Sequence, residues 1–215
     1  MYFEKSSRSK LNRHPERGSF DKETIYKIID EVLYCHVSFL QDDKPFVIPT
    51  IHARMDDSII LHGAIASRML KHILAGNEVC IAITLMDGLV LARSVFHHSM
   101  NYRSVVIFGK GEVVMEKEAK LNALHAITDH ILPGRWEDAR QPNEKELNST
   151  TVVSIKIEEA SAKIRTGPPK DDDEDYDLPV WAGVIPFIPM LSEPVRDPDQ
   201  NENILLPDYI KKMLK

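Results

Sequence analysis

Between residues 67 and 104 of this 215-residue chain, three arginines stand beside a serine, in the pairs Ser67-Arg68, Arg93-Ser94 and Arg103-Ser104. A guanidinium next to a hydroxyl offers the charge-assisted, bidentate hydrogen bonds that a phosphate monoester accepts. Any one of these arginines could be an ordinary surface residue at the end of a strand. Three such pairs in one part of the chain favour a site for an anionic ligand.

The first pair lies where a predicted strand runs into a predicted helix. Residues 58–61 form a short, mostly apolar run, and from residue 65 apolar side chains recur at helical spacing until Gly76. The unpaired amides of a first helical turn carry partial positive charge, to which Ser67 and Arg68 would add a hydroxyl and a guanidinium. This junction is the predicted phosphate cradle.

His62 and Gly63 stand at the end of that predicted strand. Glycine lets a backbone approach a ligand closely, and an imidazole can donate a proton near neutral pH. His62 is therefore either a candidate for proton delivery or a hydrogen-bonded histidine of the junction.

The remaining histidines and cysteines do not suggest a metal centre or a nucleophile. Cys35-His36 and His97-His98 are adjacent pairs, whose side chains point to opposite faces of a strand. We expect no dedicated zinc or iron site, because the spacings typical of such ligands are missing from these residues. The chain also has no Gly-x-Ser-x-Gly elbow, Walker loop or Gly-x-Gly-x-x-Gly turn, which makes hydrolase and nucleoside-triphosphate functions poor interpretations.

Short strands and a few helices must position these side chains. Helical spacing predicts helices near residues 20–33, 65–74, 116–132 and 204–214, and apolar runs predict strands at 34–40, 45–53, 58–61, 78–85, 89–94, 105–115 and 150–157. Helices that alternate irregularly with antiparallel hairpins are typical of a small barrel with helices at its ends. The predicted fold is mainly β with flanking helices.

Turn residues set the expected hairpins. Residues 41–44 have turn composition, and Asp87-Gly88 between two apolar runs is a strong hairpin signal. Pro49 cannot donate to a ladder, so its strand should lie at an edge or be bulged. Gly109 and Gly111 within one strand predict a bulge or a close backbone approach.

Composition places the chain among globular proteins, with a formal net charge of −6 that disfavours nucleic-acid binding. No apolar run has the length of a membrane span, and residues 1–17 lack the apolar segment of a secretory signal. Two cysteines in apolar runs suit free thiols in a reducing compartment, so we expect a cytoplasmic protein. We expect a flexible N-terminus over residues 1–12, one domain over 13–190, with an acidic, solvated loop at 167–179 and an extended stretch at 181–190, and a tail with a short helix over 191–215.

Several short motifs occur in a consistent order between about residue 13 and residue 186. They are Arg17-Gly18, Val47-Ile48-Pro49-Thr50, Leu61-His62-Gly63-Ala64 with Ser67-Arg68, Asp87 to Ser94, His98 to Val105, Pro133-Gly134-Arg135, Ser161 to Arg165, and Trp181 to Val184. Together they resemble the flavin-nucleotide-binding branch of the pyridoxamine 5'-phosphate oxidase-like superfamily, which includes the 5-nitroimidazole resistance proteins. The resemblance implies an antiparallel, Greek-key-like split β-barrel that forms a homodimer and binds FMN between its subunits.

The resemblance also assigns roles to single residues. Ser67 and Arg68 match the residues that hold the FMN phosphate, and Arg103 and Ser104 match a strand position with polar side chains at the flavin. His62 lies near the position of a flavin-adjacent histidine. The strand whose backbone meets the isoalloxazine edge matches Val47, Ile48, Pro49 and Thr50, and a late tryptophan over the site matches Trp181.

Two departures from the oxidases are informative. Met69 follows Arg68 where the oxidases have a second cation, so Arg93, with Ser94, is a candidate for the missing phosphate contact. The C-terminal arginine and histidine signature for pyridoxal phosphate is missing, which argues against vitamin B6 oxidation.

The resulting hypothesis is an FMN-dependent oxidoreductase or reductase acting on a small flat substrate, either nitroimidazole reductase-like or related to pyridoxamine phosphate oxidase. The alternative is a non-catalytic flavin- or haem-binding module, in which His62, His97 or His98 could be an axial ligand. A third possibility is an interaction protein without a ligand, in which the three arginines are solvated.

Overall fold

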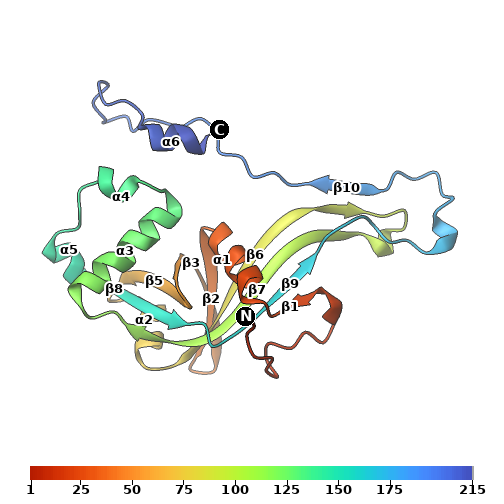
Figure 1. Cartoon of the computed structure of the whole chain (residues 1–215), viewed down its shortest axis with the longest axis horizontal. Helices are drawn as coiled ribbons and strands as arrows, with labels where there is room; N and C mark the ends of the chain where they lie inside the picture. Colours follow the sequence, from red (N-terminus) through yellow and green to blue (C-terminus); the bar gives the residue numbers. More distant parts are fainter. Residues whose placement is uncertain (215) are drawn as a thin grey trace.

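The computed structural model describes residues 1–214 and consists mostly of antiparallel β-sheet with a few flanking helices (Figure 1). Strands pair in the order β3-β2-β6-β7-β8-β5-β4, with β9 and β1 joined to β7 and β10 joined to β6. Within residues 1–214 the sheet does not close on itself, and this open arrangement agrees with a split barrel. The strands are β1 (Gly18–Ser19), β2 (Tyr34–Gln41), β3 (Lys44–Ile51), β4 (Ala53–Met55), β5 (Ser58–Ala64), β6 (Glu78–Leu91), β7 (Ser99–Val113), β8 (Thr150–Lys156), β9 (Glu159–Arg165) and β10 (Gly183–Pro186).

Within the described residues, six α-helices and three 3-10 turns accompany the sheet. The helices α3, α4 and α5 gather at one end beside β5 and β8, whereas β6 and β7 extend together toward the other end (Figure 1). The helices are α1 (Lys22–Glu31), α2 (Arg68–Leu74), α3 (Lys117–Ile131), α4 (Arg135–Asp138), α5 (Glu144–Ser149) and α6 (Asp208–Met213), and the turns are η1 (Pro15–Arg17), η2 (Val95–His97) and η3 (Asp173–Asp175).

The hairpin predicted at Asp87-Gly88 is wrong. β6 continues through these residues and pairs with β7 from Glu78 opposite Lys110 to Val90 opposite Ser99, with a register shift between Met86 and Gly88. A two-residue type I′ turn needs positive φ at both central residues, and Asp87 does not have it. The Asp-Gly step is a β-bulge within one long strand, and the chain reverses later, at η2.

The hairpin predicted at residues 41–44 is confirmed. β2 and β3 pair in register from Tyr34 opposite Ile51 to Gln41 opposite Lys44. Asp42 and Asp43 adopt φ values of 51° and 56°, the left-handed geometry that a tight hairpin turn requires. β3 lies at the end of the strand order, as Pro49 within it predicts.

The main core lies between the sheet and helices α1 and α2. Ile25 and Ile29 of α1 and Leu70 and Ile73 of α2 are all fully buried, which reflects the apolar spacing of each helix. The core of fully buried side chains also includes Val37, Ile59, Leu61, Ile81, Val105, Ile107, Val153 and Ile155. A second, smaller cluster joins α3 to β4, β5 and β8.

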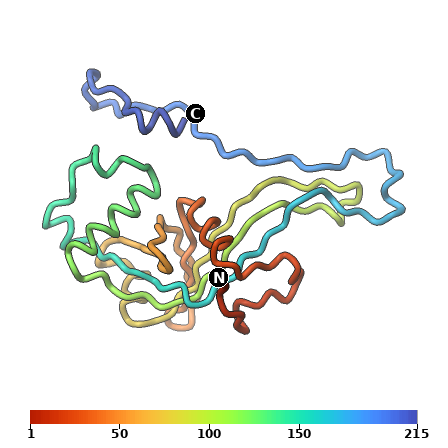
Figure 2. The backbone as a smooth tube through the Cα atoms, in the orientation of Figure 1, coloured from red at the N-terminus to blue at the C-terminus, as the bar shows by residue number. Residues whose placement is uncertain are grey.

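The two ends of the chain differ in how they meet this body. Phe3 is buried in the main core, and the guanidinium of Arg8 pairs with Glu78 and Glu159, so the first residues contact the sheet. The C-terminal segment follows β6 as β10, leaves the body as an extended arm and returns at α6 beside α4 (Figure 2). No helix within residues 1–214 is long and apolar enough to cross a membrane.

Gly109 tests the close packing of β7 against β8. A Cβ atom at this position would lie 2.3 Å from the backbone oxygen of Lys156, which cannot move away as a side chain would. We expect Gly109→Ala to lower the free energy of unfolding by about 1–3 kcal/mol, because overpacking displaces backbone.

Urea unfolding of Gly109→Ala and of the neighbouring, exposed Lys110→Ala measures this effect. The Lys110 variant should stay within about 0.5 kcal/mol of the wild type. Equal stabilities of the wild type and Gly109→Ala would contradict the described strand packing.

Candidate functional site

The junction between β5 and α2 has the strand-to-helix geometry that the sequence predicts. Ser67 is the N-cap of α2, and its hydroxyl accepts a hydrogen bond from the backbone N–H of Leu70 at 3.4 Å. Arg68 is exposed, and its guanidinium lies 4.4 Å from the ring centroid of Phe46 in β3. This contact brings the β5–α2 junction next to the edge strand.

A cavity of about 440 Å³ opens at this junction. Its lining includes the cations Arg68 and Lys71 and contains no carboxylate among the described residues; the full lining is Gln41, Ala66, Arg68, Lys71, His72, Ala75 and Asn77. Lys71 lies one turn of α2 beyond Ser67, so it can supply the second cation that Met69 does not. The cavity is electrostatically suited to a phosphate group.

His62 lies on β5 opposite Val152 of β8 and is partly buried. Burial lowers the pKa of its imidazole, so the ring is neutral near pH 7. Its Nδ1 atom is shielded from solvent and has no hydrogen-bond partner within residues 1–214. A neutral imidazole with a free ring nitrogen can accept a proton or ligate a metal ion.

Arg93 and Ser94 are engaged with the acidic segment that follows β9. The Oδ1 atom of Asp171 accepts hydrogen bonds from the backbone N–H of Arg93 at 2.9 Å and of Ser94 at 3.2 Å, and Oδ2 pairs with the Arg93 guanidinium at 3.2 Å. The Asp171 side chain is fully buried, so the prediction of a solvated loop is wrong at this residue. Burial would raise the pKa of Asp171, but hydrogen bonds from the Ser94 and Arg93 amides and from the Arg93 guanidinium hold it below its usual range.

Arg103 is held between two carboxylates. Its guanidinium pairs with Asp87 at 2.7 Å and with Glu31 at 2.8 Å, and these bonds raise its own pKa and lower that of Glu31. Ser104 donates a hydrogen bond to the backbone oxygen of Lys163 at 3.3 Å. Arg103 therefore joins the end of α1 to the β6 bulge, and its charge is already compensated.

Four of the predicted site residues lie in two groups at opposite ends of β6. Arg68 and Val47 belong to the end where β2 pairs with Cys80, whereas Arg93 and Trp181 lie beside the end where β10 pairs with Leu91. At about 3.3 Å per residue the two ends are roughly 35 Å apart. One chain does not bring both groups to one small ligand.

The edge strand and Trp181 are accessible at these two ends. One side of the β3 backbone has no partner strand within residues 1–214, and Val47 is 60% exposed. Trp181 is 65% exposed, with its ring close to Gly183. The rest of the predicted β3 segment, Ile48, Pro49 and Thr50, lies along the same free edge.

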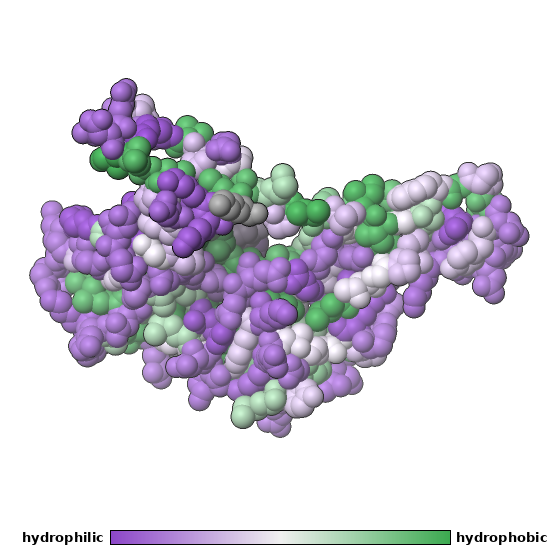
Figure 3. Space-filling view, turned by 45° about the horizontal axis from the view of Figure 1, so that its top comes forward, coloured by the Kyte–Doolittle hydropathy of each residue, from purple (hydrophilic) through white to green (hydrophobic). Residues whose placement is uncertain are grey.

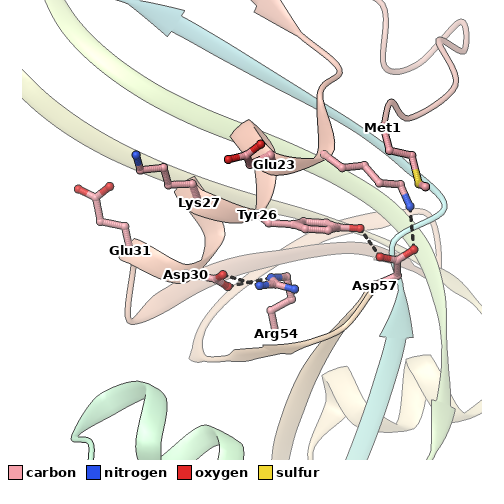
Figure 4. Close-up of a pocket in the computed structure, with 9 residues that line it drawn as sticks. Met1, Glu23, Tyr26, Lys27, Asp30, Glu31, Arg54 and Asp57 are labelled. Carbon is pink, nitrogen blue, oxygen red and sulfur yellow. Dashed lines mark hydrogen bonds and ion pairs between the residues drawn. The ribbon is translucent and has the colours of Figure 1, made fainter.

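A larger cavity of about 940 Å³, which the sequence analysis missed, lies over α1 (Figure 4). Its charges pair with one another: Lys22 bonds Asp57 at 2.7 Å, Tyr26 also bonds Asp57, and Arg54 bonds Asp30 at 2.9 Å. Burial and the bond to Asp57 raise the pKa of Tyr26. These side chains come from α1 and from the residues around β4, which are too far apart in the sequence for a local pattern to predict their contact.

His52 is a second residue that sequence reasoning missed. It is fully buried; its Nε2 atom lies 3.1 Å from the Ile29 oxygen, and its ring centroid is 5.2 Å from that of His130. Its Nδ1 atom has no partner within residues 1–214. Burial lowers the pKa of His52 to about 4, so a neutral imidazole lies where α1 and α3 meet the sheet.

Comparison with known proteins identifies the family. A pyridoxamine 5'-phosphate oxidase family profile matches residues 21–164, which is most of the described sheet. The chain belongs to this family. The match confirms the resemblance inferred from the short motifs and the split-barrel fold that it implied. A comparison with curated protein sequences found none that matches.

Two solved structures are similar over nearly the whole chain. The flavocytochrome Anf3 from Azotobacter vinelandii is 38% identical, with a TM-score of 0.91 over 97% of each chain. The FAD and haem binding protein from Mycobacterium smegmatis is 32% identical, with a TM-score of 0.88 over 92% of this chain and 97% of that chain. A protein classed with 5-nitroimidazole antibiotic resistance proteins, from Bacteroides thetaiotaomicron, is 24% identical, with a TM-score of 0.58 over 68% of this chain and 86% of that chain, and shares the fold.

The buried neutral His52 predicts a pH dependence of stability. Its folded pKa is about 4 and its ordinary value is 6.5, so the unfolded chain binds more protons between these values and stability falls as pH falls. Between about pH 7 and about pH 4.5 this single group should cost about 2 kcal/mol.

Urea unfolding at the two pH values measures this loss in the wild type, in His52→Gln, which can still donate a hydrogen bond but does not titrate, and in the exposed control His36→Gln. The loss should shrink in His52→Gln and stay unchanged in His36→Gln. Equal losses in all three proteins would contradict the assigned burial of His52.

Proposed function

We propose that this chain is a redox protein that binds a flavin and haem. The observation that carries the proposal is its similarity, over nearly the full length of both chains, to the flavocytochrome from Azotobacter vinelandii and to the FAD and haem binding protein from Mycobacterium smegmatis. Both similarities cover more than nine tenths of this chain and therefore extend beyond residue 164, where the family profile ends. A bound flavin would supply hydride and one-electron chemistry, and haem would supply one-electron and oxygen chemistry.

The β5–α2 junction fits a flavin phosphate. Arg68 and Lys71 line a cavity without a carboxylate among the described residues, and Arg68 rests on a ring rather than on an acid. The free edge of β3 beside it offers backbone groups to a flat heterocycle. We propose FAD as the flavin, because it is the form named for the M. smegmatis relative.

Three histidines were candidates for a haem ligand, and they differ in what their nitrogens already contact. His97 lies 3.3 Å from Asp172, and Nδ1 of His98 accepts a hydrogen bond from the Ala92 N–H at 3.3 Å. His62 is neutral, partly buried and has a free Nδ1 atom among the described residues. We therefore propose that His62 is the histidine that would ligate the haem iron.

A second candidate function is an FMN-dependent oxidoreductase or reductase acting on a small flat substrate, with His62 as proton donor. The family match favours it, because the profile is that of pyridoxamine 5'-phosphate oxidase. The two candidates differ in the role of His62. Loss of haem from His62→Ala with retention of flavin supports the ligand, whereas retained cofactors with slower turnover support the proton donor.

We also propose a homodimer in the cytoplasm. Arg68 and Trp181 lie at opposite ends of β6, so a second copy is needed to bring both predicted groups to one flavin. The C-terminal segment from Trp181 onward carries apolar side chains that face solvent (Figure 3), including Trp181, Ile185, Phe187, Ile188, Met190 and Leu191. Cys35 and Cys80 are free thiols, and burial raises the pKa of Cys35 to about 12, which suits a reducing compartment.

An absorption spectrum of the purified protein tests the proposed cofactors. We expect a haem Soret band together with flavin absorption, and FAD on chromatography of the released flavin. Haem should be missing from His62→Ala, while the flavin remains. Release of FMN without haem would favour the second candidate, and a protein that can be loaded with neither cofactor would contradict both.

Arg68→Ala tests the phosphate contact separately. Removing a charge-assisted hydrogen bond should weaken flavin binding about 10- to 100-fold while haem content stays constant. Equilibrium titration with FAD after removal of bound flavin measures the dissociation constant. The control is Arg140→Ala, which removes an exposed arginine that pairs with Glu146 near α5. Equal affinities of the two variants would place the phosphate elsewhere.

A further inference from the structure

A histidine and two carboxylates converge where α3 turns into α4. The Nε2 atom of His125 lies 3.3 Å from Oδ2 of Asp129 and 3.4 Å from Oε1 of Glu137. This Nε2 atom is shielded from solvent and has no hydrogen-bond partner within residues 1–214, because neither carboxylate is aligned for a bond. One potential ligand atom from each residue lies within 4.8 Å of the other two.

The local fold accounts for this convergence. His125 and Asp129 are four positions apart on α3 and therefore share one face, the spacing used by pairs of metal ligands on helices. Gly134 adopts φ of 84° and reverses the chain, so that α4 brings Glu137 to the same face. The sequence analysis expected no zinc site because it considered only histidines and cysteines; here the helical pair is a histidine and an aspartate, and the third residue lies across the turn.

Outer contacts orient two of the three groups. The Gly134 N–H donates a hydrogen bond to Oδ1 of Asp129 at 3.3 Å, which leaves Oδ2 facing His125. The ring of Trp136 stacks on the His125 imidazole with centroids 5.1 Å apart and planes 15° apart. Contacts of this kind orient the side chains that bind the ion directly at metal centres.

We propose that His125, Asp129 and Glu137 bind a divalent metal ion, with Zn²⁺ as the ion that the distances suit. Zinc bonds to nitrogen and oxygen are about 2.0–2.2 Å long, so tetrahedral ligand atoms are about 3.3–3.6 Å apart. The two measured separations from Nε2 lie in this range. A neutral imidazole and two carboxylates also balance the charge of a divalent ion.

The surroundings favour a cation with an open coordination position. No lysine or arginine within residues 1–214 pairs with Asp129 or Glu137. A cavity of about 310 Å³ adjoins His125 and Trp136, which leaves room for water as a fourth ligand. The other grouping of this type within residues 1–214 is His97 with Asp172 and Asp175, and Asp172 directly follows Asp171, the partner of Arg93.

Isothermal titration of the purified holoprotein with ZnCl₂, after dialysis against a chelator, tests the site. We expect one zinc per chain and a loss of affinity of about 100-fold or more in His125→Ala and in Glu137→Gln, because each removes a direct ligand. His97→Ala should bind zinc like the wild type. The site does not involve the proposed flavin or haem, so their failure leaves this test intact.

Glu137 is exposed, and glutamine has nearly the same shape. The thermal unfolding temperature of Glu137→Gln, compared with that of the wild type, shows whether the fold is kept. The opposite interpretation is a His125 side chain that only packs between the two carboxylates, which needs no metal. Zinc affinity that is equal in the wild type, His125→Ala and Glu137→Gln would establish that interpretation and overturn the proposal, as would the lack of stoichiometric binding to the wild type.

Discussion

The pairing of β6 with β7 is the constraint on which the rest of the structure depends. It runs from Glu78 opposite Lys110 to Val90 opposite Ser99 and is the longest ladder in the sheet. Every other part of the sheet attaches to it: β2 and β10 to β6, and β8 and β9 to β7. The bulge near Gly88 is fixed from outside the pair, because Asp87 and Glu31 share the Arg103 guanidinium. The contact between Arg103 and Glu31 therefore ties α1 to the β6–β7 pair.

The length of the β6–β7 pair separates the positively charged side chains that could bind an anionic ligand. Arg93 and Arg103 are compensated by buried or half-buried carboxylates, so they stabilise the fold rather than a phosphate. At the other end, Arg68 and Lys71 have no carboxylate partner among residues 1–214. The exposed, apolar segment that begins at Trp181 lies beside the end of β6 that leads to Arg93. A site that uses both ends needs two chains, which is how the fold leads to the proposed dimer.

Some turns and helix ends were predicted correctly from the sequence, because residues close to them in the chain determine their structure. The turn at Asp42-Asp43, the capped junction at Ser67 and the helix that ends near Gly134 were all predicted correctly. The strand β9 was missed because small residues rather than β-branched ones fill it, and the bulge was misread because Gly88 is needed by β10, whose Ile185 oxygen would lie 2.7 Å from a Cβ there.

The partners of Arg93 and Arg103 could not be predicted for a related reason. Asp171 is 78 positions from Arg93 and Glu31 is 72 positions from Arg103, so no local pattern links them. The proposed function requires two copies of this chain that hold a flavin and haem together. Native mass spectrometry of the purified protein tests it most directly: a dimer whose mass includes both cofactors is predicted, and a monomer without either would contradict it.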